Sequence, residues 1–516
     1  MKTANVFGNH MVLQRDIELP VWGEAAPGTR VVVRIQGQEA STAADAEGKW
    51  KLSIGPLRVS RDETMTVEGE DETLCFSRVA VGEVWLAGGQ SNMEFHMRYD
   101  KQFKEAVADC ANPDIRFFDC PKLSYEGEEY DFDYSSFGFW RPCNAENLQW
   151  YSAVGYYFAQ KLHAELDIPV GILGCNLGGS RAVCWMDEDT AKECAQVWLE
   201  EYAEGLKKIP DLNAYFAQYK SDPVNDHSHP FDNPIADRML YGVTLEEMQE
   251  ILSSLFGENK SPVFAFQIGP CHDWRPHGLY YTMLKKIAPY GIRGVIWYQG
   301  ESDAFHADAY ASVLSGMIGC WRRLWGFELP FLMAQLAPLA ELADPSAAGY
   351  PAICRAQQTV SETLPGVWCS ATGDVGSFHD IHPKEKRPVG QRLALLALNH
   401  IYGESGLLCE APLAQDCSLE NGELVLRFRY GQGLYRSSDA PLPLKVSIEG
   451  QSLEEARGLD VALKDNTLRI RSESLDLSRW ETVSMGADPW YVMNLCNAAD
   501  IPAKPFLLRR NSHEPR

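Results

Sequence analysis

The sequence predicts an α/β fold in which a three-layer, doubly wound parallel sheet is flanked by N- and C-terminal β-sandwich-like regions. Two observations support this prediction. Between residues 81 and 405, short apolar runs alternate with segments whose apolar residues recur at helical spacing. At residues 1–80 and 406–516, short alternating apolar and polar runs are separated by turn residues. We therefore expect three domains with these boundaries.

The flanking regions are expected to be all-β. Residues 29–35 and 50–54 alternate β-branched or aromatic side chains with polar ones, and turn residues at 27–28 and 45–48 precede them. In the C-terminal region the same criterion predicts strands at residues 423–428, 444–448 and 468–470.

The middle region alternates between the two periodicities. Its predicted strands run through residues 84–89, 170–174, 294–298, 331–336 and 367–372. Its predicted helices run through residues 151–166, 308–325, 347–364 and from Pro383 to about residue 402. Residues 187–265 form an insertion of charged helical segments with a Pro-, His- and Asp-rich loop at 222–237. We interpret this insertion either as a lid near the site or as surface decoration.

Composition excludes several classes of partner. The 516-residue chain has a formal net charge of −24, which argues against binding to nucleic acid or anionic membranes. No apolar stretch reaches the length of a membrane span, and the first residues lack the apolar core of a secretory signal. The 14 cysteines show no Cys-x-x-Cys pair or zinc-type spacing. We therefore expect a cytoplasmic protein without a metal site; the oligomeric state is not readable from the sequence.

The segment most informative about function is Val-Trp-Leu-Ala-Gly-Gly-Gln-Ser-Asn-Met, residues 84–93. An apolar strand stops at two glycines, a polar triplet follows, and a helix is expected from Met93 onward. A serine hydroxyl at the carboxyl end of a strand, beside the N–H groups of a helix start, has the surroundings that a nucleophile and its oxyanion need. Ser91 is therefore a candidate nucleophile, and the alternative is an ordinary N-cap serine.

Two further strands end in turns that supply hydrogen-bond donors. One ends at Gly178-Gly179-Ser180 and the other at Gln299-Gly300-Glu301. We expect the Ser91 N–H, the Gly179 N–H and the Gln299 amide to form an oxyanion hole, although the glycines also suit plain turns. Glu301 is either an orienting carboxylate of the site or a solvated loop acid.

A general base is expected in the segment Phe-His-Asp-Ile-His-Pro at residues 378–383. His382 lies in the loop between a predicted strand and the helix predicted to open at Pro383, with Asp380 two positions earlier. This arrangement fits a base oriented by an acid. The alternatives are a helix cap with a structural histidine, and a metal site that uses His379 and His382.

Four segments in this order resemble the sialate O-acetylesterase-like family of carbohydrate esterases, within the SGNH hydrolase superfamily. They are residues 89–93, 178–180 with Trp185 downstream, 297–302 and 380–383. Residues 11–15, 21–23 and 494–506 resemble the N- and C-terminal ends of the family.

The resemblance implies a role for each site residue. Ser91 is the nucleophile, His382 the general base and Asp380 the orienting acid, while Ser91, Gly179 and Gln299 form the oxyanion hole and Asn92 and Gly178 support it. The reaction is hydrolysis of a sugar O-acetyl ester through an acetyl-enzyme, without metal or organic cofactor. The superfamily usually spaces acid and base as Asp-x-x-His, but this position holds His379, so Glu301, Asp374 or a Ser–His dyad remain alternatives.

The substrate is expected to be an acetylated carbohydrate, either a 9-O-acetylated sialate or an acetylated xylo- or manno-oligosaccharide. Trp185, Trp297 and Tyr298 could stack on a sugar face, although aromatic residues near strand ends more often belong to the core. Arg181 could bind the carboxylate of a sialate, although such an arginine is more often a surface or structural charge. Two other functions remain open: a non-catalytic carbohydrate-binding protein on a hydrolase scaffold, and a lipase or thioesterase on the same catalytic core.

Overall fold

The computed structural model describes most of the chain, and the chain divides into two compact units. The described residues are 1–221, 234–242, 244, 246–247, 250, 267–340, 345–448, 450–454, 458–473 and 476–510. The first unit comprises Met1–Gln299 with Ser312–Phe331, and the second comprises Gly300–Ala311 with Leu332–Arg516. These units cut across the boundaries expected at residues 80 and 405, so the three-domain division stays a prediction.

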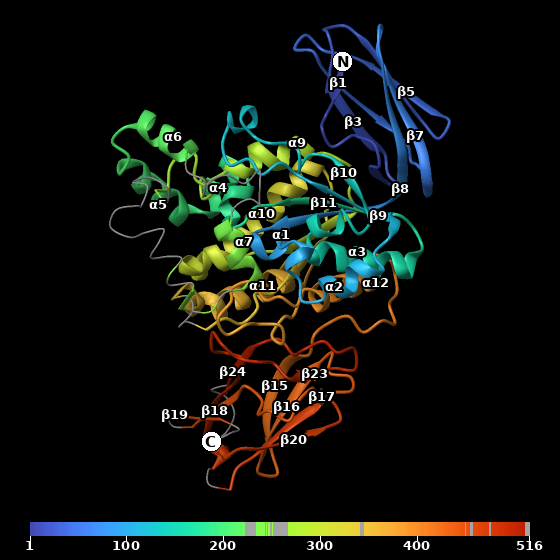
Figure 1. Cartoon of the computed structure of the whole chain (residues 1–516). Coiled ribbons are helices and arrows are strands. Elements are labelled where there is room, and N and C mark those ends of the chain that lie inside the picture. The colour runs from blue at the N-terminus through green and yellow to red at the C-terminus, as the bar shows by residue number, and fades with distance from the viewer. Residues whose placement is uncertain are drawn as a thin grey trace. The chain divides into compact units, whose positions relative to one another are not determined.

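A single long strand, β8 (Thr73–Gly89), joins the N-terminal β region to the central sheet of the first unit (Figure 1). Its first half pairs antiparallel with β7, and its second half pairs parallel with β11 and β12. No linker therefore separates the two regions. The strands before β8 are β1 (Lys2–Thr3), β2 (Val12–Gln14), β3 (Leu19–Glu24), β4 (Arg30–Ile35), β5 (Gln38–Ala43), β6 (Lys49–Ile54) and β7 (Ser60–Glu68). Among these, β4 and β6 confirm the strands predicted at 29–35 and 50–54.

The central sheet of the first unit is parallel except at one edge. Its strand order is β10, β9, β11, β8, β12, and only β10 runs antiparallel. The chain leaves β8 for β9 on one side and later reaches β12 on the other side. The carboxyl end of β8 therefore lies where the strand order reverses, which is where α/β sheets bind ligands. The new strands are β9 (Asn112–Asp119), β10 (Trp140–Cys143), β11 (Val170–Asn176) and β12 (Gly294–Tyr298).

Helices pack on both faces of this sheet. The two helices concerned are α3 (Ala153–Leu166) and α10 (Tyr310–Trp325). Phe158 of α3 contacts Trp85 of β8 with ring centroids 5.1 Å apart, and Trp321 of α10 contacts Trp297 of β12 at 5.6 Å. Trp297 pairs with Gly88, which is three residues after Trp85 on β8. Because side chains alternate between the two faces along a strand, the two tryptophans point to opposite faces of the sheet.

The other described helical segments of the first unit contain at most 12 residues. They are α1 (Ser91–Glu94), η1 (Met97–Tyr99), α2 (Phe103–Ala108), η2 (Glu128–Tyr130), η3 (Leu148–Trp150), η4 (Ala182–Trp185), α4 (Glu188–Cys194), α5 (Gln196–Lys207), α6 (Leu212–Ser221), α7 (Pro234–Tyr241), the π-helix η6 (Tyr280–Leu284) and α9 (Lys285–Ile287). The loop predicted at 222–237 lies outside the described residues up to 233, and its last residues belong to α7. None of the described helices combines the length and apolarity that a membrane span requires.

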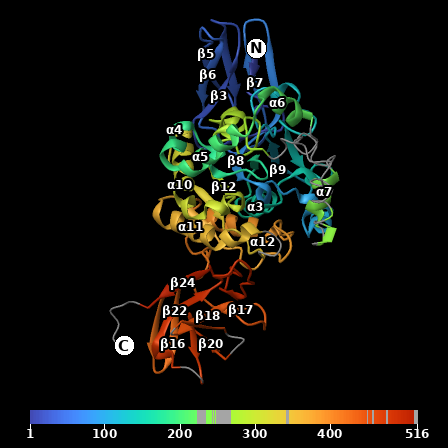
Figure 2. The ribbon, with the colours of Figure 1, turned by 90° about the vertical axis from the view of Figure 1, so that its left-hand side faces the viewer.

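The second unit contains strands β13 and β14 with their helices, followed by the C-terminal strands (Figures 1 and 2). The C-terminal strands pair in the orders β15-β16-β21-β20 and β19-β18-β22-β24, with β17 paired to β23. Leu424, Leu444, Leu468 and Val483 are fully buried and build the core of this part. The strands are β13 (Phe331–Ala334), β14 (Val367–Ser370), β15 (Leu413–Glu420), β16 (Glu423–Arg429), β17 (Tyr435–Arg436), β18 (Leu444–Ile448), β19 (Gln451–Glu454), β20 (Asp460–Lys464), β21 (Thr467–Arg471), β22 (Trp480–Met485), β23 (Leu495–Cys496) and β24 (Phe506–Arg509). The helical segments are η7 (Glu301–Ala309), η8 (Pro345–Gly349), α11 (Tyr350–Thr363), α12 (Arg387–His400) and η10 (Leu477–Arg479).

Two predicted helix starts are wrong. The helix expected from Pro383 is α12, which begins four residues later at Arg387 and carries Pro388 in its first turn. Proline fits the first turn of a helix because the N–H groups of that turn have no acceptor within the helix, so the N–H that proline lacks is not needed there. Both Pro383 and Pro388 suit such a position, and the sequence alone does not choose between them. The helix expected from Met93 begins at Ser91 and contains only four residues.

Candidate active site

Ser91 occupies a sharp turn that depends on a glycine. At Gly89, the last residue of β8, φ is +134°, and a Cβ there would lie 2.1 Å from the Tyr298 carbonyl oxygen. The next residue, Gln90, donates its backbone N–H to the same carbonyl at 3.1 Å and is the N-cap of α1. Ser91 is therefore the first helical residue and not the cap, so the N-cap interpretation of Ser91 is wrong. Its hydroxyl is not needed to begin the helix.

The turn after β11 lies directly against this serine. Leu177 donates its N–H to the Gly89 carbonyl at 3.1 Å, which ties the two turns together. A Cβ at Gly178 would lie 3.5 Å from the Cβ of Ser91, and Gly179 has φ of +73°. Among the described residues, no backbone group accepts a hydrogen bond from the N–H of Ser91 or of Gly179. Neighbouring N–H groups without acceptors are the donors that an oxyanion hole requires.

Gly178 has a different role from its neighbour. Its N–H donates to Oε2 of Glu94 at 2.6 Å, so this amide is used inside the protein. Glu94 thereby orients the glycine turn and leaves the Gly179 N–H as the open donor. The sequence analysis missed Glu94, although an acid three residues after a serine at a predicted helix start was a readable signal.

Gln299 is also engaged within the protein. The side chain is fully buried, and its Nε2 donates to the Ser180 carbonyl at 3.2 Å. This hydrogen bond connects the end of β12 to the turn that carries Gly179. Gln299 therefore braces the turn, and its direct donation to an oxyanion stays a prediction. Asn92, expected to support the site, is a buried residue of α1.

A buried ion pair supports these strand ends from inside. Lys122 donates from Nζ to Oδ1 of Asp119 at 2.7 Å, to the Asn176 carbonyl at 3.0 Å and to Oδ1 of Asn176 at 2.9 Å. The Asn176 amide donates in turn to the Ala87 carbonyl at 2.9 Å. Burial raises the pKa of Asp119 to about 6, although the Lys122 ammonium opposes that rise. Lys122 thus links the carboxyl ends of β9 and β11. Asn176 extends this link to the carboxyl end of β8.

The aromatic residues expected to stack on a sugar belong to the core. Trp185 and Trp297 have no exposed surface, and Tyr298 is 1% exposed. Trp185 donates its indole N–H to Oγ of Ser180 at 3.0 Å, and Trp297 packs on Trp321. Buried rings offer no face to a ligand, so the structure corrects the stacking role to a packing role.

Arg181 is not available as a free cation for a substrate carboxylate. Its side chain is 4% exposed and forms an ion pair with Glu201, with Nη1 and Oε2 2.6 Å apart. Its guanidinium also stacks on Trp274, 3.6 Å from the ring centroid. The expectation that Arg181 binds a sialate carboxylate is therefore corrected: its charge is neutralised by a carboxylate of the protein.

Trp274 is the aromatic residue that the sequence analysis missed. This half-buried side chain donates its indole N–H to the Gly179 carbonyl at 2.7 Å and covers Arg181. It thus stands beside the open Gly179 donor. The available signal was a tryptophan within a loop rich in Gly, Pro and His at residues 269–278, since loop aromatic residues bind ligands more often than strand aromatic residues do.

His382 and Asp380 lie in the second unit, in the loop before α12. Nδ1 of His382 is 3.9 Å from Oδ1 of Asp380, which exceeds a hydrogen bond. The Asp380 carboxylate instead accepts the His382 backbone N–H at 2.8 Å and pairs with Lys384 at 2.9 Å. Burial lowers the pKa of His382 to about 3, helped by the positive charges of Lys386 and Lys384 and opposed by Asp380. His382 is therefore neutral at physiological pH, the state of a general base. Its pairing with Ser91 stays a prediction.

Two other carboxylates were alternatives for the orienting acid. The two carboxylate oxygens of Asp374 accept hydrogen bonds from Nη1 and Nη2 of Arg392, at 2.8 and 2.6 Å. This bidentate pair engages both oxygens of the acid. Glu301 is buried at the start of η7. Where the structure describes the chain, the one cluster of three metal-type donors includes neither His379 nor His382, so it does not support a metal site at that pair.

Known proteins resemble this chain over most of its length. The family profile "Carbohydrate esterase, sialic acid-specific acetylesterase" matches residues 268–399. The sialate O-acetylesterase of Mus musculus is 25% identical over 83% of this chain and 79% of its own, and that of Homo sapiens is 26% identical over 83% and 76%. The crystal structure of a carbohydrate acetylesterase from Xanthomonas citri is 26% identical, with a TM-score of 0.73 over 98% of this chain and 99% of that one.

These similarities include the segments that carry the site. The profile begins just before Trp274 and extends through Gln299 and His382, and the crystal structure matches the fold from end to end. The chain is a carboxylic ester hydrolase that is similar to the sialate O-acetylesterases and to the Xanthomonas citri carbohydrate acetylesterase.

Proposed function

We propose that the protein is a serine esterase that removes O-acetyl groups from a carbohydrate through an acetyl-enzyme. The observation that carries this proposal is the contact between the Ser91 turn and the Gly178-Gly179 turn, where two backbone N–H groups have no acceptor among the described residues. The relatives described as sialate O-acetylesterases and the Xanthomonas citri carbohydrate acetylesterase supply the substrate class. The parallel sheet with helices on both faces supports an SGNH-type three-layer fold between two sandwich-like β regions.

The proposed reaction uses one nucleophile and one base. Oγ of Ser91 attacks the acetyl carbonyl carbon while His382 accepts the hydroxyl proton, and the N–H groups of Ser91 and Gly179 stabilise the oxyanion. Collapse of the tetrahedral intermediate breaks the bond to the sugar oxygen, which takes the proton from His382. A water molecule then attacks the acetyl-enzyme, with His382 again accepting the proton, and acetate leaves. Asp380 orients His382 through its backbone contact.

Release of acetate from defined acetylated sugars tests the function. We expect turnover of an O-acetyl sugar, with the rate falling steeply as the acyl chain of the same sugar ester lengthens from acetyl to octanoyl. Binding of acetylated sugars without any acetate release would instead indicate a non-catalytic carbohydrate-binding protein. A preference for octanoyl esters would indicate a lipase or thioesterase. Comparing 9-O-acetyl sialate with acetylated xylo- and manno-oligosaccharides then separates an acidic from a neutral substrate.

The pH dependence of catalysis should reflect the lowered pKa of His382. Because burial lowers the pKa of His382 to about 3, the base stays neutral well below the 6.5 of ordinary imidazole. We expect kcat/KM to show no acid limb near pH 6.5 and to fall only at lower pH. The unfolded chain binds a proton on this histidine near pH 6.5 and the folded chain does not, so stability should decline as the pH falls below that value.

Kinetics and circular dichroism measured together between about pH 5 and 8 check this prediction. The spectrum identifies any loss of rate that comes from unfolding. An acid limb near pH 6.5 in protein that is still folded would contradict the assignment of a neutral His382 as the base.

Trp274 should contribute to sugar binding. Replacing Trp274 with alanine removes the half-buried ring beside Gly179, and we expect KM for an acetylated sugar to rise roughly 5- to 30-fold, the equivalent of about 1–2 kcal/mol. Trp274→Phe keeps an aromatic face and should preserve most of the sugar affinity. The acetate ester of a small acyclic alcohol has no ring to stack and provides the control. Equal increases of KM for both esters in Trp274→Ala would remove Trp274 from sugar recognition.

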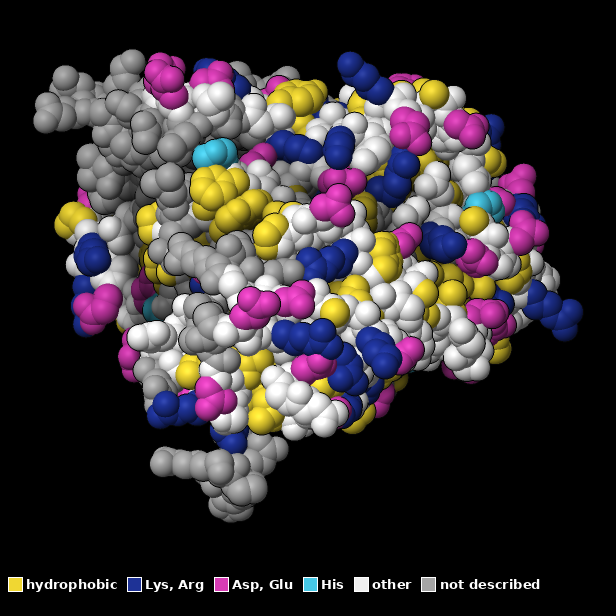
Figure 3. Space-filling model, turned by 90° about the horizontal axis from the view of Figure 1, so that it is seen from below, with side chains coloured by type: hydrophobic (Ala, Val, Ile, Leu, Met, Phe, Trp, Pro, Cys, Tyr) yellow, Lys and Arg dark blue, Asp and Glu magenta, His cyan; other side chains and the backbone are white. Residues whose placement is uncertain are grey.

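The charge of the surface bears on the class of partner. On the face shown in Figure 3, acidic and basic side chains are interspersed and do not form one basic patch. Together with the net charge of −24, this supports a small-molecule or carbohydrate substrate over nucleic acid. A cytoplasmic location stays a prediction.

A further inference from the structure

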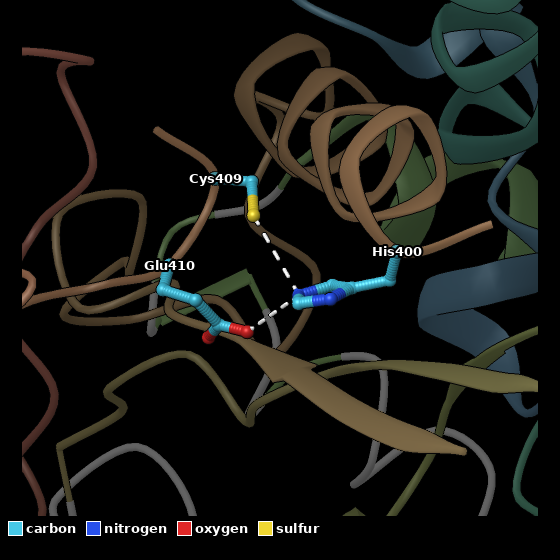
Figure 4. Close-up of side chains that lie close together, drawn as sticks. All are labelled: His400, Cys409 and Glu410. Atoms are coloured by element: carbon cyan, nitrogen blue, oxygen red, sulfur yellow. Dashed lines mark hydrogen bonds and ion pairs between the residues drawn. The ribbon is translucent and has the colours of Figure 1, made fainter. Parts of the chain in front are cut away.

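Three metal-type donor groups converge in the second unit (Figure 4). His400 is the last residue of α12, and Cys409 and Glu410 follow in the loop before β15. Nε2 of His400 lies 2.9 Å from Oε1 of Glu410 and 3.6 Å from Sγ of Cys409. All three donor atoms lie within 4.8 Å of one another. Two segments nine residues apart therefore bring an imidazole, a thiol and a carboxylate to one point.

One ring nitrogen of His400 is the meeting point of the other two groups. Nε2 of His400 carries either one hydrogen or one lone pair, yet both Glu410 and Cys409 approach it. Within the protein, the two groups share a single Nε2–H, with the Cys409 sulfur as the weaker and more distant acceptor. A metal ion placed between the three atoms uses a lone pair from each of them at once.

The spacing of the atoms fits a tetrahedral ion. With Zn–S of about 2.3 Å and Zn–N and Zn–O of about 2.0 Å, ideal tetrahedral edges are about 3.5 Å for N···S and about 3.3 Å for N···O. The observed separations are 3.6 Å and 2.9 Å. The third pair, Cys409 and Glu410, lies within 4.8 Å, so their side chains must rotate toward each other when an ion binds.

The surroundings hold the imidazole and leave a position open. The His400 ring stacks on Trp368 with centroids 4.6 Å apart and planes 15° apart, which fixes its orientation. His400 and Glu410 line a cavity of about 520 Å³. The side chains of His400 and Glu410 are 23% and 13% exposed, so an ion can reach them. Lys504, buried at 4% exposure, also lines this cavity.

We propose that His400, Cys409 and Glu410 form a zinc site with one open coordination position facing this cavity. Thiolate, imidazole and carboxylate are the ligand set that zinc takes in proteins, and the thiolate disfavours calcium and magnesium. On binding, the Cys409 thiol releases its proton, and the two anionic ligands balance the charge of the ion. The site connects the end of α12 to the loop that leads into the C-terminal strands.

Metal loading of the full-length protein without a histidine tag tests the proposal. After chelator treatment, we expect the chain to take up about one zinc ion per molecule and to gain thermal stability. Cobalt should give a thiolate charge-transfer band and tetrahedral visible absorption. Cys409→Ser should remove that band, and Glu410→Gln should weaken zinc affinity by more than about 100-fold. Glu410 is partly exposed, so Glu410→Gln keeps the test valid if Cys409→Ser fails to fold.

Cys75→Ser is the matched control, because Cys75 is an exposed cysteine outside the cluster. Unchanged zinc uptake in this variant, with loss in the Cys409 and Glu410 variants, supports the site. Absence of uptake by the wild-type chain at micromolar free zinc overturns the proposal. Uptake that survives Glu410→Gln and His400→Gln unchanged overturns it as well, since the ion then binds elsewhere.

Discussion

Replacing Ser91 with alanine is expected to lower kcat for an acetylated sugar by about 10⁴- to 10⁶-fold, or roughly 5–8 kcal/mol of barrier. Ser91 begins α1 at a turn held by Gly89 and the Tyr298 carbonyl, so the backbone does not depend on its hydroxyl. The backbone donors remain in the variant, and substrate binding should therefore change little. We expect the loss to appear in kcat, with KM within a few-fold of the wild type.

The control is Ser53→Ala, which removes an exposed hydroxyl on β6 and should leave the rate unchanged. Circular dichroism and melting temperature confirm that both variants fold. A fluorophosphonate probe should label the wild type at Ser91 and should not label Ser91→Ala, as mass spectrometry of the peptide would show. Substantial acetate release by folded Ser91→Ala, or labelling at a different serine, would remove Ser91 from the mechanism.

The regular elements of the central sheet were predictable because their periodicity is local. The runs at 170–174 and 294–298 are β11 and β12, and the helical pattern at 151–166 is α3. Strand ends in a parallel sheet lie at one edge, so Ser91 and Gly179 could be brought together from sequence alone. The contact between their turns, with a Gly178 Cβ position 3.5 Å from Ser91, confirms that convergence within the first unit.

Burial and partner choice were not predictable, because they depend on packing between distant segments. Trp297 follows an apolar run and precedes a site motif, so it suits both a core and a sugar platform; only the contact with Trp321 assigns it to the core. The sequence could not decide whether Arg181 is a free cation or a structural charge, because Glu201 of α5 lies beside it only in the fold. Cys409 and Glu410 do not belong to a recognisable zinc-binding sequence motif. The third donor, His400, lies at the end of α12, nine residues before Cys409, and only the fold brings it to them.

Replacing Lys122 with methionine is expected to destabilise the protein by about 3–5 kcal/mol. In the sequence this lysine resembles a surface loop residue, yet its side chain is 1% exposed and all three ammonium hydrogens have acceptors. The variant leaves the Asp119 carboxylate and Asn176 buried without their donor. Chemical unfolding followed by tryptophan fluorescence measures the loss. Lys161→Met breaks an exposed i,i+4 pair with Glu165 and should cost less than about 0.5 kcal/mol, which makes it the matched control.

The pH dependence of this loss identifies its cause. Burial already raises the pKa of Asp119 to about 6 with Lys122 present, and removal of the ammonium raises it further. A folded-state pKa above the unfolded value means that the folded chain binds the extra proton, so stability of Lys122→Met should recover as the pH falls from about 7 towards 5. The double variant Lys122→Met/Asp119→Leu carries no buried charge and should regain most of the lost stability at pH 7. A loss that is independent of pH and persists in the double variant would show that packing, and not an unpaired carboxylate, is responsible.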